Sequence, residues 1–251
     1  MDKGGGIEAL VAKPRPLLQL LRPPNLFTVP GDPLCGALVA SHGEWSWRIV
    51  PAVLISLAAY CAGLVINDLA DYREDLRDRP GRPLPSGAVS KRTAGILAAS
   101  FGIVAMITAS CVNGLTLILT LLLLAEICFY NLFAKKIGFL APLAMGLCRG
   151  LSVLVGAAAV NPFRAGVVPV QGWPLLAACI ILLYIAAVTA LARNETASPR
   201  IPPLIGALIR GLLFIQAGFC ALAGGAGYAA AILLLALWPV SRLVARRYYA
   251  S

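Results

Sequence analysis

The sequence predicts an all-α integral membrane protein, a bundle of about eight (eight or nine) transmembrane helices. Hydrophobic residue types make up 59% of the 251 residues and charged residues only 13%. That charged share is about half of the roughly 25% found in soluble globular proteins. A surface that faces water cannot be built from so few charges, so the composition excludes a soluble enzyme or a disordered regulator. The apolar segments also follow one another without a soluble insert, which predicts a single transmembrane domain over residues 1–251.

Eight segments can each place about 20 apolar residues across a bilayer core. In the first of them Asp32 follows Pro30 and Gly31, which predicts a broken helix that opens to a cavity. Short linkers at residues 112–114 and 224–227 predict two tight helical hairpins. Long polar loops after the second and sixth segments predict two pseudo-repeats of four helices, approximately 17–134 and 138–245. The eight segments lie near 17–41, 48–70, 92–111, 113–134, 138–160, 173–193, 202–223 and 227–245.

The cations predict how the chain is oriented in the membrane. The N-terminus, the C-terminus and the loops at 71–92, 134–138 and 193–201 together hold 17 of the 21 Lys and Arg residues. The opposite face holds only Arg48 and Arg164. The positive-inside rule then places both termini in the cytoplasm and the protein in the inner (cytoplasmic) membrane. The net charge of +10 is therefore expected to face the lipid bilayer and not nucleic acid.

Carboxylates concentrate where the second segment ends. On a helix at 100° per residue, Asn67, Asp68, Asp71, Asp75 and Asp78 fall within an arc of about 100°. Carboxylates on one face repel one another and need a cation. Hard oxygen ligands suit magnesium, which proteins usually share with a substrate phosphate. The alternative interpretation is a solvated, charged loop, but a cluster that directly continues an apolar helix favours function.

A basic loop follows the acidic cluster. Three prolines and two glycines between Arg79 and Gly87 end the helix and shape the loop. Arg79 and Arg82 can neutralise phosphate oxygens through forked hydrogen bonds. Metal-binding acids beside anion-binding arginines fit a diphosphate ester as the substrate.

Two arginines fall inside apolar segments, where a charge at the helix centre costs at least ~2.5 kcal/mol. Arg149 in the fifth segment is expected to line a central cavity and to meet Asp32, Glu126 or the diphosphate of the substrate. An internal salt bridge without a catalytic part would explain Arg149 equally well. Arg210 in the seventh segment is interpreted as structural.

The acidic cluster and the basic loop resemble motifs of the UbiA superfamily of membrane prenyltransferases. The first aspartate-rich motif of that superfamily, NDxxDxxxD, is matched in full by residues 67–75. Its Arg-Pro-Leu-Pro-Ser-Gly run is matched by residues 82–87. Arg22 and Asn25 resemble its opening Arg-Pro-x-Asn signature. Tyr130 with Lys135 or Lys136 resembles the tyrosine and lysine after its fourth helix. Together these motifs cover the N-terminal three-fifths of the chain.

The resemblance implies a UbiA-like bundle around a central cavity that opens to the cytoplasmic side and to the membrane. In that family magnesium holds an isoprenyl diphosphate, whose loss of diphosphate leaves a carbocation for an aromatic or lipid-like acceptor to attack. Asp68, Asp71 and Asp75 would be catalytic, and together with Asn67 they would hold the metal. The residues implied in substrate binding are Arg22, Asn25, Asn67, Arg79, Arg82, Tyr130, Lys135, Lys136, Arg149, Arg193, Asn194 and Glu195.

The second half of the chain departs from the family pattern. The family carries a second motif, typically DxxxD, after its sixth helix, where this chain has Arg193, Asn194 and Glu195. After Asp78 the only acidic residues are Glu126 and Glu195. Arg193 is therefore a candidate counter-charge to diphosphate in place of a metal ion.

The altered second motif and the short chain resemble the EboC-like branch of the superfamily. That branch occurs in gene clusters linked to secondary metabolites and their export. Two functions follow from the resemblance. One is a magnesium-dependent prenyltransferase, with partners encoded in a metabolite-export gene cluster. The other is a non-catalytic carrier or binding protein that moves a metabolite precursor towards the periplasm.

Overall fold

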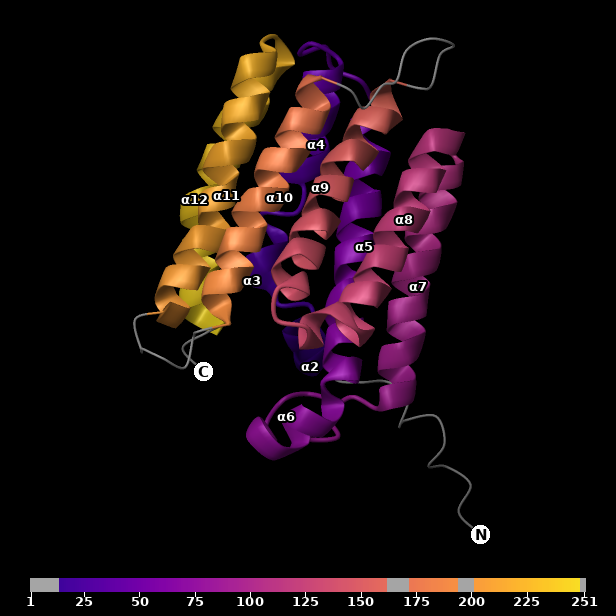
Figure 1. Ribbon diagram of the computed structural model, residues 1–251, viewed down its shortest axis with the longest axis vertical. Coiled ribbons are helices and arrows are strands. Elements are labelled where there is room, and N and C mark those ends of the chain that lie inside the picture. Colours follow the sequence, from indigo (N-terminus) through magenta and orange to yellow (C-terminus); the bar gives the residue numbers. More distant parts are fainter. Residues whose placement is uncertain (1–13, 162–171, 194–200, 249–251) are drawn as a thin grey trace.

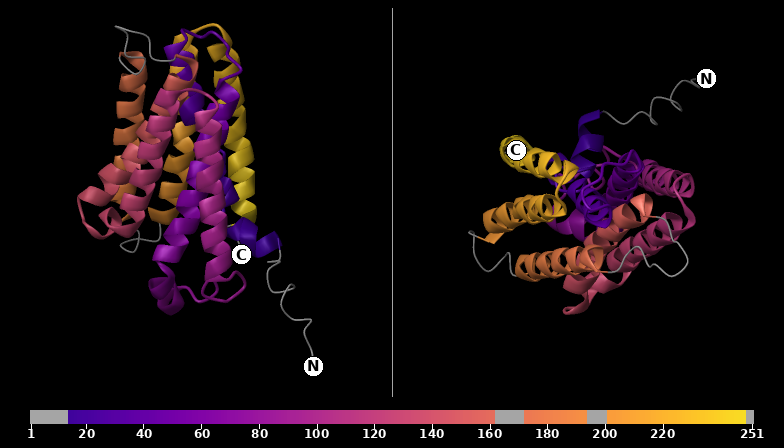
Figure 2. Two further views of the ribbon diagram at one scale, coloured as in Figure 1. Left: turned by 90° about the vertical axis from the view of Figure 1, so that its right-hand side faces the viewer. Right: turned by 90° about the horizontal axis from the view of Figure 1, so that it is seen from above.

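The computed structural model describes residues 14–161, 172–193 and 201–248, and every regular element in these ranges is a helix. The long helices run side by side (Figure 1), and from above they follow one another around the molecule in chain order (Figure 2). The elements are α2 (Pro14–Leu20), α3 (Pro23–Leu26), α4 (Gly31–Ala40), α5 (Ile49–Ala70), α6 (Tyr72–Asp78), α7 (Lys91–Ser110), α8 (Gly114–Leu132), the 3-10 helix η1 (Ala134–Lys136), α9 (Leu140–Val160), α10 (Trp173–Ala192), α11 (Ile201–Ala223) and α12 (Ala226–Tyr248).

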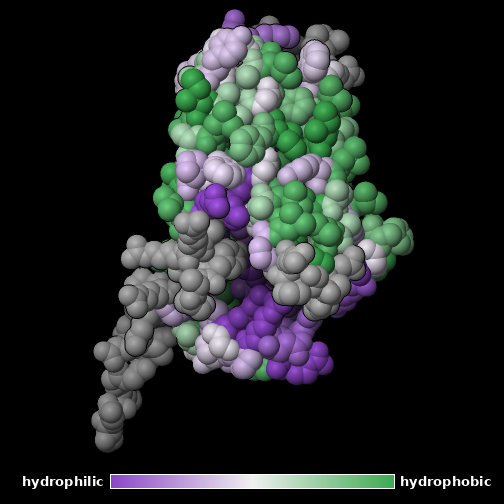
Figure 3. All heavy atoms as spheres, turned by 90° about the vertical axis from the view of Figure 1, so that its left-hand side faces the viewer, coloured by the Kyte–Doolittle hydropathy of each residue, from purple (hydrophilic) through white to green (hydrophobic). Residues whose placement is uncertain are grey.

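Seven of the described helices, α5 and α7 to α12, are long and apolar enough to cross a membrane. Hydrophobic residues cover the upper part of the surface in Figure 3, and hydrophilic residues gather at the lower end. Trp45 and Trp47, between α4 and α5, and Trp173, the first residue of α10, are exposed, and such rings are typical of a membrane–water interface. The predicted multi-pass membrane protein is confirmed.

Both described ends of the chain lie at the same end of the bundle. The start of α2 and the end of α12 are at the lower end in Figure 1, where α6 also projects. This arrangement agrees with the prediction that both termini lie on the same side of the membrane. The cytoplasmic location of that end and the division into two four-helix halves remain predictions.

The first apolar segment is where the structure differs from a simple span. Residues 17–41 do not form one helix; they belong to α2, α3 and α4. Proline lacks an N–H donor and clashes with the preceding turn, so a helix cannot run through it undisturbed. Pro23 begins α3, and Arg22 before it takes a left-handed conformation with φ 44°. Pro30 directly precedes α4, which confirms the predicted break before Asp32.

The two predicted hairpins are present. Asn113 caps α8 by accepting a hydrogen bond from the backbone N–H of Thr116, and its side-chain amide also donates to the carbonyl of Ala158. Gly224 and Gly225 both have positive φ angles, of 76° and 49°, and they reverse the chain between α11 and α12. Glycine adopts these angles without the steric cost that a Cβ imposes.

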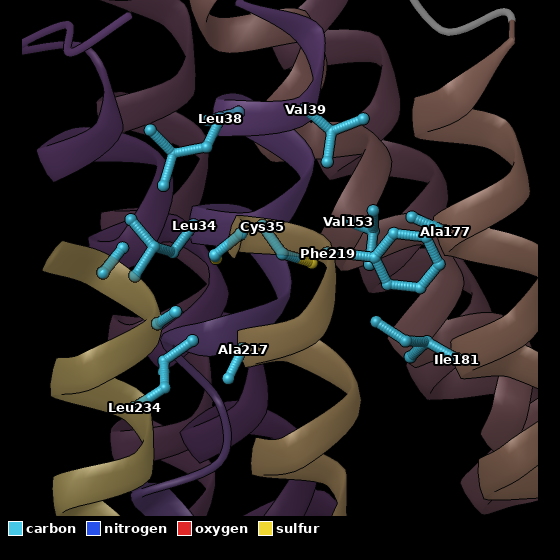
Figure 4. Packing of buried hydrophobic residues seen from close by; sticks show 14 of the residues in the cluster. Leu34, Cys35, Leu38, Val39, Val153, Ala177, Ile181, Ala217, Phe219 and Leu234 are labelled. Carbon is cyan, nitrogen blue, oxygen red and sulfur yellow. The ribbon is translucent and has the colours of Figure 1, made fainter. Parts of the chain in front are cut away.

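Helix α4 lies at the centre of the main core. All residues from Gly31 to Val39 are buried. Leu34 and Leu38 belong to one buried cluster with Val153 of α9 and Leu234 of α12, which Figure 4 shows. This position brings the polar residues of the broken segment into the interior of the bundle.

Small residues let α4 and α9 approach each other at the backbone. A Cβ on Gly36 would overlap the carbonyl of Val153, and a Cβ on Gly156 would overlap the backbone of Pro33. Without a hydrophobic driving force between lipid-embedded helices, such close backbone packing supplies much of the association energy.

We expect Gly156→Ala to lower the free energy of unfolding by about 1–3 kcal/mol, because the added methyl group meets backbone that cannot rotate away. Thermal unfolding of the detergent-solubilised protein measures this. Gly102→Ala in α7 is the matched control, since nothing lies within 4 Å of its added Cβ. Equal melting temperatures for the two variants would show that the α4–α9 contact tolerates a wider spacing.

Candidate functional site

The acidic cluster lies where α5 passes into α6. The two helices are nearly continuous, because the N–H of Asp71 donates to the carbonyl of Asn67 and the N–H of Asp75 donates to that of Asp71. Asp71 itself lies between the helices with φ −88° and ψ 3°. The helical spacing therefore persists through the motif, and Asn67, Asp68, Asp71 and Asp75 remain within successive turns.

Each aspartate of the motif is paired with a cation from a different part of the chain. Arg22, just before α3, donates to Asp68 at 2.6 Å. Lys135 of η1 lies 2.5 Å from Asp71. Arg82 of the following loop donates to both oxygens of Asp75, at 2.9 and 2.7 Å. The predicted repulsion among the carboxylates is therefore relieved by the protein's own cations.

The structure distinguishes between the predicted anion-binding residues. Lys135 contacts the motif, whereas Lys136 is exposed and directed to solvent. Arg82 lies 3.9 Å from Asp68 as well as beside Asp75, so it bridges two turns of the motif. Arg79 directly follows α6 and is exposed. Lys135 and Arg82 each form an ion pair with the motif.

Asp78 lies apart from the other acids, although the helical arc groups it with them. Its carboxylate accepts a hydrogen bond from the neighbouring Arg77 at 2.8 Å, and both side chains are exposed. The hydrogen bond from Arg77 lowers the pKa of Asp78. The arc is an incomplete guide here, because Asp78 is the last residue of α6 and lies in an exposed turn.

An apolar cavity of about 440 Å³ extends from the motif into the bundle. Arg22, Asn25, Asn67 and Tyr130 border it near the motif. On α5 its lining reaches from Asn67 to Ser56, which is about 16 Å along the helix at 1.5 Å per residue. Its walls are mainly apolar and include Leu64, Ile127, Ile185, Val188 and Ile209.

A second polar cluster lies beside this cavity, within the bundle. Arg149 of α9 pairs with Asp32 of α4 at 2.8 Å and donates to the carbonyl of Thr28 at 2.8 Å. Gln216 of α11 donates to the same carbonyl at 2.9 Å and to Asp32 at 2.6 Å. Of the three partners expected for Arg149, the structure selects Asp32. Thr28, Asp32 and Arg149 line the cavity.

Gln216 is a residue that the sequence interpretation missed. It is fully buried in α11, a helix that is otherwise apolar around it. A polar side chain in the middle of a transmembrane segment is costly and marks a functional or packing contact. That signal could have been read from the sequence, but the partner could not.

The residues of the altered second motif are only partly described. Arg193 follows α10 and is exposed, and its Nη2 atom approaches the backbone at Gly138, with 3.8 Å to an added Cβ there. Gly138 lies two residues after η1, so Arg193 is near the loop that carries Lys135. Asn194 and Glu195 lie outside the described residues.

Comparison with known proteins identifies the family. Residues 33–249 match the UbiA prenyltransferase family. The chain belongs to this family. The digeranylgeranylglyceryl phosphate synthase of Natronomonas pharaonis is 31% identical over 165 residues, which cover 66% of this chain and 58% of that protein. The match thus spans somewhat more than half the length of this relative.

Solved structures show the same fold. A UbiA homologue from Aeropyrum pernix in its apo form has a TM-score of 0.59 and 22% identity, covering 87% of this chain and 88% of that one. A UbiA homologue from Archaeoglobus fulgidus bound to DMAPP and Mg2+ has a TM-score of 0.55 and 16% identity, covering 92% and 87%. This UbiA family member therefore has the UbiA fold over most of its length.

The donor chemistry at the motif of this UbiA family member fits magnesium. Asn67 Oδ1 and Asp71 Oδ1 lie 3.4 and 2.5 Å from the same Lys135 ammonium, so two hard oxygens already converge on one positive charge. Within the described ranges no three His, Cys, Asp or Glu side chains are grouped tightly enough to hold a metal ion. A metal ion shared by these carboxylates would have to replace the protein cations that now pair with them.

Proposed function

We propose that this UbiA family member is a magnesium-dependent prenyltransferase that moves a prenyl group from an isoprenyl diphosphate to an aromatic or lipid-like acceptor. The proposal rests on one observation: the aspartate motif and the three cations paired with it lie at one end of an apolar cavity. This arrangement matches the two parts of the donor, since its charged head needs cations and its chain needs an apolar space.

The basic side chains would bind the diphosphate. Arg22, Arg82 and Lys135 are held at the motif by carboxylates, and an incoming diphosphate and its metal would redistribute these pairs. When bound, magnesium would supply positive charge that stabilises the leaving diphosphate, held by Asn67, Asp68, Asp71 and Asp75. Arg22 also borders the cavity, so it would hold the diphosphate close to the first carbons of the chain.

The prenyl chain would occupy the apolar part of the cavity. Its walls exclude water, which would otherwise capture the carbocation formed when diphosphate leaves. Tyr60 and Tyr130 line the same space. Aromatic rings attract positive charge, and these two are therefore the side chains best suited to stabilise the allylic cation.

The names of the relatives bear on the class of acceptor. The relatives are named for the synthesis of a glyceryl phosphate lipid, which favours a lipid-like acceptor. The second half offers Arg193, and Glu195 as its only acid near the expected second motif. We therefore propose that this protein uses fewer metal ions than family members with two aspartate-rich motifs, and that Arg193 helps to neutralise the diphosphate. An EboC-like role in secondary metabolism, with partners from a metabolite-export gene cluster, would fit this change. The motif end would face the cytoplasm of the inner membrane.

The experiment uses the full-length protein in nanodiscs with magnesium and radiolabelled isoprenyl diphosphates of several chain lengths. We expect magnesium-dependent release of diphosphate with at least one chain length, and its loss when the metal is chelated. The alternative function is a non-catalytic carrier or binding protein, favoured by the altered second motif. Measurable binding without release at any chain length would establish that alternative and overturn the enzyme.

We expect Lys135→Gln to weaken binding of the isoprenyl diphosphate about tenfold, because one charge-assisted contact at the motif is lost. Lys136→Gln is the matched control, with the same change of charge one residue away on an exposed side chain. Equilibrium binding of a labelled diphosphate to both variants measures the difference. Equal losses would mean that only the overall charge of η1 matters.

A further inference from the structure

The inner end of the cavity carries polar groups that a site for a prenyl chain does not need. Asp32 is fully buried and Arg149 is 7% exposed, yet both line the cavity. Ser56 and Ser152 line it as well, are buried, and lie 2.8 Å apart between their hydroxyl oxygens. All four lie in the membrane-embedded part of the bundle, where polar groups are costly and tend to serve a function.

The hydrogen-bonding capacity of this inner cluster is not exhausted by the protein. Asp32 Oδ2 lies 2.8 Å from Arg149 Nε, but the two groups are not aligned for a hydrogen bond. Neither atom has a hydrogen-bond partner among the described residues. Buried polar atoms are rarely left in this state, so the ion pair at the inner end of the cavity keeps one acceptor and one donor whose hydrogen bonding the described residues do not complete.

We propose that this inner cluster is a second subsite of the cavity, one that binds a neutral hydroxyl group of the acceptor. The cluster has one carboxylate and one guanidinium, so its net charge is zero. An anionic carboxylate or phosphate would be repelled by the carboxylate of Asp32. An alcohol or phenol can instead donate a hydrogen bond to Asp32 and accept one from Arg149. The proposal rests on the proposed function, because it names the class of acceptor for the same cavity.

The position of the subsite separates it from the diphosphate site. About 16 Å of α5 lies between Asn67 and Ser56 at 1.5 Å per residue. The walls between them are mainly apolar. A ligand that satisfies both the walls and the subsite therefore has an apolar body and a hydroxyl group, and the prenyl donor itself has no such group.

The test measures binding and does not require turnover. The full-length protein in nanodiscs is titrated with tritiated dodecanol, with dodecyl methyl ether and with dodecanoate. These three probes share one chain length, and only the alcohol both donates and accepts without a charge. We expect the wild type to bind the alcohol at least about tenfold more tightly than the ether or the carboxylate, the effect of one hydrogen bond to a charged group.

The double variant Asp32→Asn/Arg149→Gln removes both charges together and leaves neither one unpaired. We expect it to bind the alcohol and the ether within about twofold of each other. Ser152→Ala is the milder second variant, expected to reduce the preference about threefold. Thr120→Ala is its control, since that buried hydroxyl donates to its own helix and does not line the cavity.

No preference for the alcohol in the wild type, or an unchanged preference in Ser152→Ala and in the double variant, would overturn the subsite. Tighter binding of dodecanoate would assign an anion instead and would also overturn it. Because diphosphate release is measured separately, failure of the proposed prenyl transfer would leave these binding results interpretable.

Discussion

Replacing Asp71 with Asn is expected to abolish magnesium-dependent binding of the isoprenyl diphosphate while leaving the fold intact. The substitution keeps the shape of the side chain but removes the charge that faces Lys135 at 2.5 Å. Removing a charged metal ligand should weaken binding more than removing a residue that only supports a metal ligand, which typically costs roughly 10–100-fold in metal affinity. Titration of a labelled diphosphate with and without magnesium measures the effect, and we expect a loss of at least about 100-fold.

Asp78→Asn is the matched control for Asp71→Asn. It makes the same substitution seven residues further along, at a carboxylate that pairs with Arg77 and faces solvent. We expect its magnesium-dependent binding to equal that of the wild type. Unchanged magnesium affinity in Asp71→Asn would count against the motif as the metal site, whereas a similar loss in both variants would indicate a general effect of negative charge.

The largest effect on stability is expected for Arg149→Gln. The change leaves the carboxylate of Asp32 charged and fully buried with no cation beside it. Breaking a buried ion pair by removing one partner typically costs about 3–5 kcal/mol, because the remaining charge is uncompensated. Denaturation of the solubilised protein, followed by helix content, measures the loss.

The double variant Asp32→Asn/Arg149→Gln should recover most of that stability, since it removes the unpaired charge. Replacing a buried ion pair as a whole is often close to neutral. If the single variant is as stable as the wild type, the pair does not hold α4 against α9. If the double variant is as unstable as the single one, the bundle is stabilised by packing around Arg149 and not by its charge pairing with Asp32.

The membrane class and the apolar segments could be predicted because they depend on local properties. Hydropathy over about 20 residues and the positions of prolines and glycines decide where helices form and end. The break before Asp32 and the hairpin at Gly224 follow from residues within a few positions of each turn. The NDxxDxxxD spacing likewise places its carboxylates on one side of a helix without any tertiary contact.

The partners of those carboxylates could not be predicted, because they depend on how helices are rotated and packed. Lys135 and Lys136 are equivalent by sequence, and only the turn of η1 directs Lys135 towards Asp71, 64 residues away in the chain. The same is true of Gln216 and Asp32, which are 184 residues apart. Contacts of this kind arise from close helix packing, which no local pattern encodes.

The sequence by itself determined that this protein folds in a lipid bilayer and that a row of carboxylates lies at the end of α5. Both follow from composition and from spacing within one helix. Only the tertiary structure decided that Arg22, Arg82 and Lys135 neutralise the motif and that Asp32 meets Arg149 beside the cavity. The physical reason is that ionic and hydrogen-bonded pairs form over a few ångströms in space, and the packing of α4 against α9 and α11 sets those distances.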